Sequence, residues 1–157
     1  MVIRSLQGLY HVAIQRHNVY VLGISTAVPF IEGVHNRIHK HVGNDGTVKC
    51  EDIFKPFVKA GQVVTTKQSV WRQTFTAPSF QEQNVTIDVY KTAAHPPPMY
   101  TTDCDRVAEL HLVLAPTRRQ QKPMIDVEMR LGDTSLTVTA KEQGTHRQVK
   151  SEINFLR

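Results

Sequence analysis

Apolar and polar residues alternate along much of the second half of the chain, which is the pattern of β-strands that bury one face. In 84–92, Val85, Ile87 and Val89 fall on one side and polar residues on the other. The same two-residue period returns in 69–76, 107–114, 125–131, 136–140 and 149–155. Turn residues separate the last three of these segments. Short strands at regular intervals with turns between them predict a mainly β fold, an antiparallel β-sandwich.

The first 60 residues are less regular. Apolar residues at helical spacing predict a short amphipathic helix over 5–15, and 20–26 reads as a strand. Proline and glycines interrupt 28–47, which we expect to be a long loop or an irregular excursion between strands. Asp52 is a suitable cap for a second short helix over 53–60, with a glycine as its stop signal.

Composition narrows the class of protein. The chain has 157 residues, of which 40% are hydrophobic, so it is long enough for one domain with a real core. Its apolar runs are strand-sized and its N-terminus lacks a continuous apolar stretch, so we expect no membrane span, no secretion and a cytoplasmic location. Cys50 and Cys104 favour two reduced thiols, although a single disulfide remains open.

The charge balance is mildly basic. Lys and Arg number 19 against 14 Asp and Glu, which gives a formal charge of +5. The basic residues are spread along the chain rather than gathered in a stripe with interleaved aromatics. We therefore expect no nucleic-acid partner.

Several segments together resemble a known family. The closing strands, 124–133, 136–140 and 149–155, are similar to the last strands of the substrate-binding domain of the 70 kDa heat-shock chaperones. Upstream, 22–26, 65–69, 75–77 and 84–90 are similar to that domain's first strands, in the same order and spacing. The resemblance covers about 20–156 and implies a peptide-binding β-sandwich.

A finer resemblance is to the divergent 12A/12B branch of that family. It rests on 30–35, the turn at 45–46, and the segments 50–54, 57–60, 132–134 and 153–156. It implies that 1–19 is a remnant of a preceding ATPase domain and that 20–157 is the sandwich, with an insertion at 28–60. We see no phosphate-binding loop in these 157 residues and expect neither an ATPase domain nor a helical lid in this chain. The implied function is binding of extended apolar peptides without an ATPase or helical lid, with ATP as a cofactor only where an ATPase domain lies upstream.

The resemblance also implies which residues contact a peptide. The floor of the pocket would be Phe75 and Val85, and one wall Ile24. The arch over the peptide would fall on Ala27, whose short side chain implies weak retention. The implied peptide-binding set is Ile24, Thr26, Ala27, Phe75, Thr76, Pro78 and Val85. The implied partners are unfolded or extended polypeptides and co-chaperones. Taken singly, each of these residues also suits an ordinary sandwich core.

Other interpretations stay open. A regulatory interaction domain with a decayed pocket would bind its partner through 28–60. A metal site is the weaker possibility: His35, His39, His41 and Cys50 are suitable ligand types, but their spacing matches no known zinc pattern. We expect no enzyme, because the chain shows no phosphate cradle and no activated nucleophile motif. Cys50 stands beside two acidic residues, which raise a thiol pKa.

Overall fold

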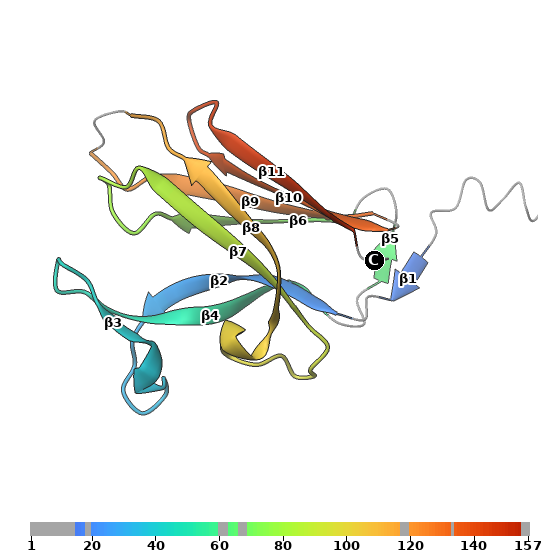
Figure 1. Cartoon of the computed structure of the whole chain (residues 1–157), viewed down its shortest axis with the longest axis horizontal. Coiled ribbons are helices and arrows are strands. Elements are labelled where there is room, and N and C mark those ends of the chain that lie inside the picture. Colours follow the sequence, from blue (N-terminus) through green and yellow to red (C-terminus); the bar gives the residue numbers. More distant parts are fainter. Residues whose placement is uncertain are drawn as a thin grey trace, which may run out of the picture.

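The computed structural model describes residues 15–17, 20–59, 63–65, 69–116, 120–132 and 134–154, and within them almost all regular structure is β (Figure 1). The strands are β1 (Gln15–His17), β2 (Val21–Pro29), β3 (Lys40–Val42), β4 (Val48–Val58), β5 (Val63–Thr65), β6 (Val70–Thr76), β7 (Asn84–Thr92), β8 (Asp105–Val113), β9 (Met124–Leu131), β10 (Ser135–Glu142) and β11 (Gln148–Asn154). Two short 3-10 turns accompany them, η1 (Arg37–His39) and η2 (Thr101–Asp103). No helix in these ranges is long and apolar enough to cross a membrane.

The strands form two facing antiparallel sheets (Figure 1). One sheet has five strands in the order β3-β4-β2-β7-β8, and the other has four in the order β11-β10-β9-β6. A separate two-stranded pair joins β1 to β5. This arrangement confirms the predicted antiparallel sandwich.

The core lies between the two sheets and follows the predicted alternation. Ile87 and Val89 of β7 are buried, and the neighbouring Leu110 and Leu112 of β8 are buried beside them. The facing sheet contributes the alternate residues of β9 and β10, namely Ile125, Val127, Met129, Leu131, Leu136, Val138 and Ala140. Because each strand points every second side chain inward, a two-residue period in the sequence is sufficient to identify these residues.

The helix predicted over 53–60 is wrong. Residues Val48–Val58 form β4, an eleven-residue strand paired with β2. Two register shifts interrupt that pairing, so the buried side chains Phe54, Phe57 and Val58 do not alternate. Their spacing of three and four residues therefore resembles that of a helix. Pro56 lies within the strand and faces Gly23 across the first irregularity.

Residues 28–47 form an irregular excursion and not one long loop. β2 continues to Pro29, and the excursion contains η1 and β3, which pairs with β4. Most of the helix predicted over 5–15 lies outside the described residues, although Gln15 itself begins β1.

Gly23 is required by the close approach of β2 to β4. A Cβ atom at this position would lie 2.3 Å from the carbonyl oxygen of Lys55 and 2.8 Å from the ring of Phe54. Contacts this short are not tolerated, and the first of them involves backbone that cannot rotate away.

We predict that Gly23→Ala lowers the free energy of unfolding by about 2 kcal/mol or more, because the two strands must separate to admit the methyl group. The matched control is Gly132→Ala, where the added Cβ would meet its nearest atom at an ordinary 3.5 Å. Urea unfolding of both variants measures the difference. Equal stabilities would show that β2 and β4 do not pack as described.

Candidate binding groove

β2 and β7 begin as neighbours and then diverge. They pair from Val21 with Thr92 to Ile24 with Val89, and no ladder pairing is described beyond that point. β2 nevertheless runs on to Pro29, held on its other side by β4, and β7 starts as early as Asn84, held by β8. Figure 1 shows the two strand pairs opening away from each other toward one end of the sandwich. The inner edges of both strands are thus left without a strand partner.

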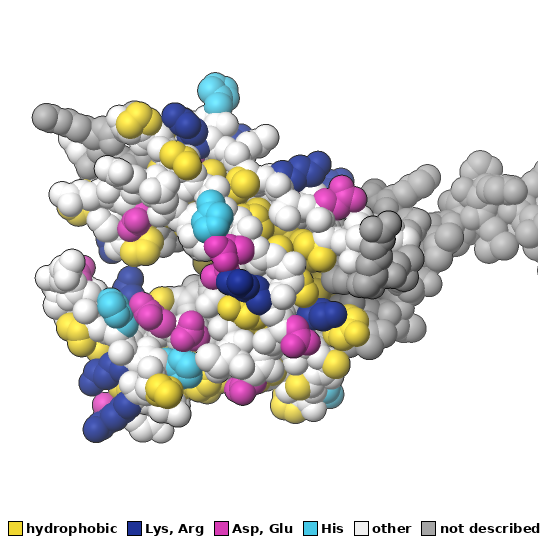
Figure 2. All heavy atoms as spheres, in the orientation of Figure 1, with side chains coloured by type: hydrophobic (Ala, Val, Ile, Leu, Met, Phe, Trp, Pro, Cys, Tyr) yellow, Lys and Arg dark blue, Asp and Glu magenta, His cyan; other side chains and the backbone are white. Residues whose placement is uncertain are grey.

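A cavity of about 590 Å³ occupies the space between the diverging strands. Figure 2 shows the surface hollowed at the corresponding end of the molecule. All seven residues of the implied peptide-binding set line this cavity: Ile24, Thr26, Ala27, Phe75, Thr76, Pro78 and Val85. We call this cavity the groove.

The floor of the groove is apolar and continuous with the core. Phe75 and Val85 are half-buried and pack against the buried cluster, so each presents part of its side chain to the opening. Phe75 also stacks on Phe57, with ring centroids 6.1 Å apart, which restricts its orientation. Ile24 is only 3% exposed and closes the inner end. Sequence reasoning missed two floor residues of β9, Ile125 and Val127, which it placed in the ordinary core.

The outer end of the groove leads to a second cavity. Ala27, Lys49, Glu51 and Pro78 line both cavities, and the second measures about 580 Å³. Ala27 is exposed, so its methyl group leaves the way between the two cavities wide. Ala27, the residue implied as the arch, therefore has too short a side chain to close the groove over a peptide.

Charged side chains form the rim. Glu51, Asp52 and Asp88 line the groove, and Lys49 is the cation among its lining residues. No periodic signal marks these residues in the sequence, because they come from β4 and β7, which lie far apart along the chain. The sequence predicts Asp52 as a helix cap, but in the structure it lies within strand β4.

Asp88 is unusual among them. Its Oδ1 atom is buried and has no hydrogen-bond partner in the described part of the chain. Burial raises the pKa of Asp88, the charge of Glu109 adds to the rise, and Arg106 opposes it. The Nη1 atom of Arg106 lies 3.6 Å from Oδ1. The inner rim thus carries a partly desolvated carboxyl group.

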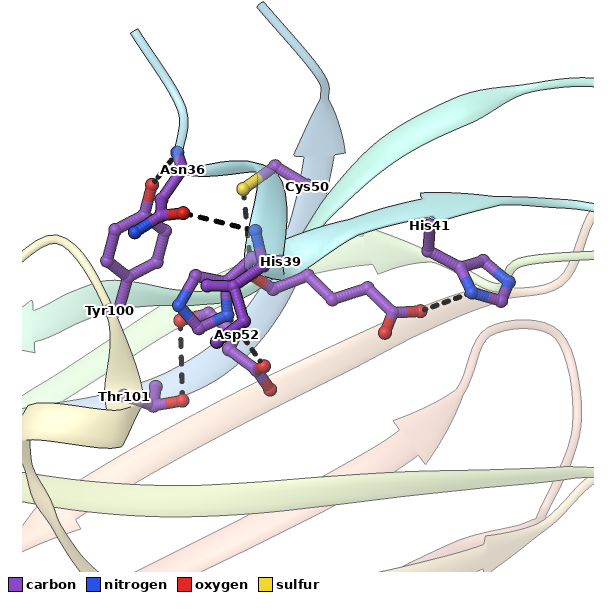
Figure 3. Close-up of polar contacts among 9 residues, drawn as sticks. Asn36, His39, His41, Cys50, Asp52, Tyr100 and Thr101 are labelled. Atoms are coloured by element: carbon purple, nitrogen blue, oxygen red, sulfur yellow. Dashed lines mark hydrogen bonds and ion pairs between the residues drawn. The ribbon is translucent and has the colours of Figure 1, made fainter.

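The four candidate metal ligands each contact other groups. His35 Nδ1 accepts a hydrogen bond from the backbone nitrogen of Ile31. His39 contacts Asp52, His41 lies 3.8 Å from the Glu51 carboxylate, and Cys50 Sγ lies 3.7 Å from the Glu51 carbonyl oxygen (Figure 3). Within the described residues, no group of three or more suitable ligands comes together. The weak metal hypothesis finds no support in this arrangement.

The two cysteines are free thiols. Cys50 is buried where β4 pairs with β2 and β3, and Cys104 is half-buried after η2. Burial raises the pKa of both thiols, and neighbouring acidic charges add to the rise. Neither thiol is therefore set up as a nucleophile.

Fold and groove together define a class: an antiparallel β-sandwich with a groove that opens between two diverging strands. Human heat shock 70 kDa protein 12A is 28% identical to this chain over 146 residues, which cover 90% of this chain and 21% of that protein. Human heat shock 70 kDa protein 12B is 29% identical over 150 residues, covering 90% of this chain and 22% of that protein. The mouse 12A protein is 28% identical over 150 residues. No family model matches the chain.

These similarities support a divergent relationship between this chain and the 70 kDa heat-shock proteins, through the 12A and 12B members. The chain spans about a fifth of the length of these curated relatives.

Proposed function

We propose that the domain binds extended apolar segments of other polypeptides in the groove, as a chaperone-like module. The observation that carries the proposal is the pair of open strand edges. An extended chain can add its backbone hydrogen bonds to such an edge, and this mode of binding makes little demand on sequence. The apolar floor below the edges supplies a place for one side chain of the client.

Micromolar affinity would require both side-chain burial in the floor and backbone hydrogen bonds to the strand edges. Burying a leucine side chain contributes about 1.5–3 kcal/mol, whereas micromolar affinity needs about 8 kcal/mol. The floor of Phe75 and Val85 alone cannot provide that difference. Backbone hydrogen bonds to the edges of β2 and β7 would supply much of the remainder.

The proposed activity is binding alone, with no catalytic step and no cofactor in the groove. Any ATP-driven release would require an ATPase domain outside these 157 residues. The residues that line the groove come from β2, β4, β6, β7 and β9. They form an apolar cleft with a charged rim.

We predict that Val85→Glu weakens binding of a fluorescently labelled apolar heptapeptide at least about tenfold, because a carboxylate in the floor must be desolvated when the client side chain enters. The measurement is fluorescence anisotropy. The matched control is Val113→Glu, the same substitution at an exposed residue that does not line the groove. Circular dichroism shows whether each variant is folded.

The two variants separate the possible outcomes. If Val85→Glu and Val113→Glu bind equally well, the peptide site lies elsewhere. If the parent chain binds no extended peptide, the proposed function is wrong and only the sandwich remains.

A second prediction concerns the arch. Ala27→Met should slow peptide dissociation by about two- to fivefold, because a longer side chain between the two cavities obstructs the exit and adds apolar contact. Stopped-flow displacement of the labelled heptapeptide measures the rate. Val34→Met, an equivalent gain of side chain in an exposed turn outside the groove, should leave it unchanged. Faster release from Ala27→Met would mean that residue 27 blocks the site instead of closing it.

One observation favours a second candidate function, partner binding through the insertion. Five large apolar residues there are exposed: Ile31 by 53%, Val34 by 58%, Ile38 by 79%, Val42 by 60% and Val48 by 39%. Such exposure in a single segment is typical of contact surfaces.

The test is the double variant Ile38→Asp with Val42→Asp. If the insertion binds the partner, this variant should lose a protein identified by mass spectrometry in pull-downs while its heptapeptide affinity stays unchanged. Val113→Asp, at another exposed valine, serves as the control. Retention of the partner by the double variant would exclude the insertion surface.

A further inference from the structure

One wall of the groove contains a bulge with an unusual backbone. Thr26 pairs with Ile53 and Val28 with Cys50, so Ala27 alone faces the two residues Glu51 and Asp52. Asp52 has φ of 59°, the left-handed region that non-glycine residues seldom occupy. Both bulge residues line the groove, so their position sets the shape of this wall.

Contacts from outside the groove hold the bulge. The Nδ1 atom of His39 lies 3.0 Å from Oδ2 of Asp52, and Thr101 Oγ1 donates to the Asp52 carbonyl at 3.3 Å (Figure 3). Because a carboxylate only accepts hydrogen bonds, this contact is a hydrogen bond in the His39 tautomer that carries its proton on Nδ1. His39 and Thr101 come from η1 and η2, segments separated by about 60 residues in sequence.

Tyr100 completes this arrangement. Its ring stacks on His39, with centroids 4.1 Å apart and an interplanar angle of 18°, and its hydroxyl accepts from the backbone nitrogen of Asn36 at 2.7 Å. Tyr100 also forms a β-bridge with Ile53, directly after the bulge. We call Asn36, His39, Asp52, Tyr100 and Thr101 the outer clip (Figure 3).

Burial within the outer clip is uneven. The His39 side chain is only 9% exposed, while that of Asp52 is 49% exposed. His39 is absent from the residues that line the groove, whereas Asp52 is among them. His39 is therefore the more buried of the two side chains. It does not line the groove itself and can act on it only through Asp52.

We propose that His39 is a positioning residue for the groove: it holds Asp52, and with it the bulge beside Ala27, in the shape that retains a peptide. This inference rests on the proposed peptide binding. Loss of the contact should loosen one wall and speed release. Because coupling between two sites is reciprocal, peptide binding should in turn change the surroundings of the His39 ring.

Three single variants and one double variant test the contact. His39→Phe keeps a ring to stack on Tyr100 but removes Nδ1, and Asp52→Gly keeps the left-handed backbone but removes the carboxylate. Each should speed dissociation of the apolar heptapeptide about three- to tenfold, and the double variant no further, since both remove the same contact. Asp52→Asn keeps an acceptor oxygen and should restore slower release than Asp52→Gly.

A second measurement uses the unmodified chain. The imidazole NMR signals of His39 should shift when the heptapeptide saturates the groove, while those of His146, in the exposed turn between β10 and β11, should not. Unchanged His39 signals at saturation, or unchanged dissociation rates in folded His39→Phe and Asp52→Gly, would overturn the role of the outer clip alone. A parent chain that binds no heptapeptide would overturn the proposed function and this inference with it.

Discussion

The divergence of β2 from β7 is the constraint on which the rest depends. After Ile24 and Val89 the two strands no longer pair, although each stays paired on its outer side, with a bulge at Ala27 in β2. Register shifts in the β2–β4 and β7–β8 ladders lie near the point of separation. Bulges of this kind increase local twist and bend a strand away from its neighbour. A sheet that would otherwise be closed therefore opens into a groove, and the same residues that would have been core become its floor.

The sequence predicted the sandwich because one face of each strand is buried. The alternation in β7, β9 and β10 identified the inward residues directly, since the side-chain period of a strand is two. The groove could not be predicted in that way. Phe75 and Val85 have the periodicity of ordinary core residues, and only the resemblance to the heat-shock family distinguished them. Their common position in one cavity with Ile24 is a property of the strand geometry.

β4 and the rim show where sequence reasoning stopped. Alternation fails in a strand with two irregularities, and Phe54, Phe57 and Val58 then imitate a helix. The carboxyl groups of Asp52 and Asp88 lie about 36 positions apart, on strands that do not pair with each other. No local pattern connects such residues. They form one rim only because β2 and β7 separate in the folded structure. Neither hydrophobic periodicity nor turn residues predict that separation.

The backbone at Asp52 connects these observations. A left-handed aspartate costs free energy, and such strain persists only where the surrounding structure enforces it. Here the enforcement comes from the side of the sheet opposite the groove, through His39 and Thr101. A glycine at position 52 would adopt the same backbone more easily but would offer no carboxylate to hold. An aspartate at this position both allows the strand to bend and holds the wall of the groove through its carboxylate. The bulge therefore shapes the groove as well as the sheet.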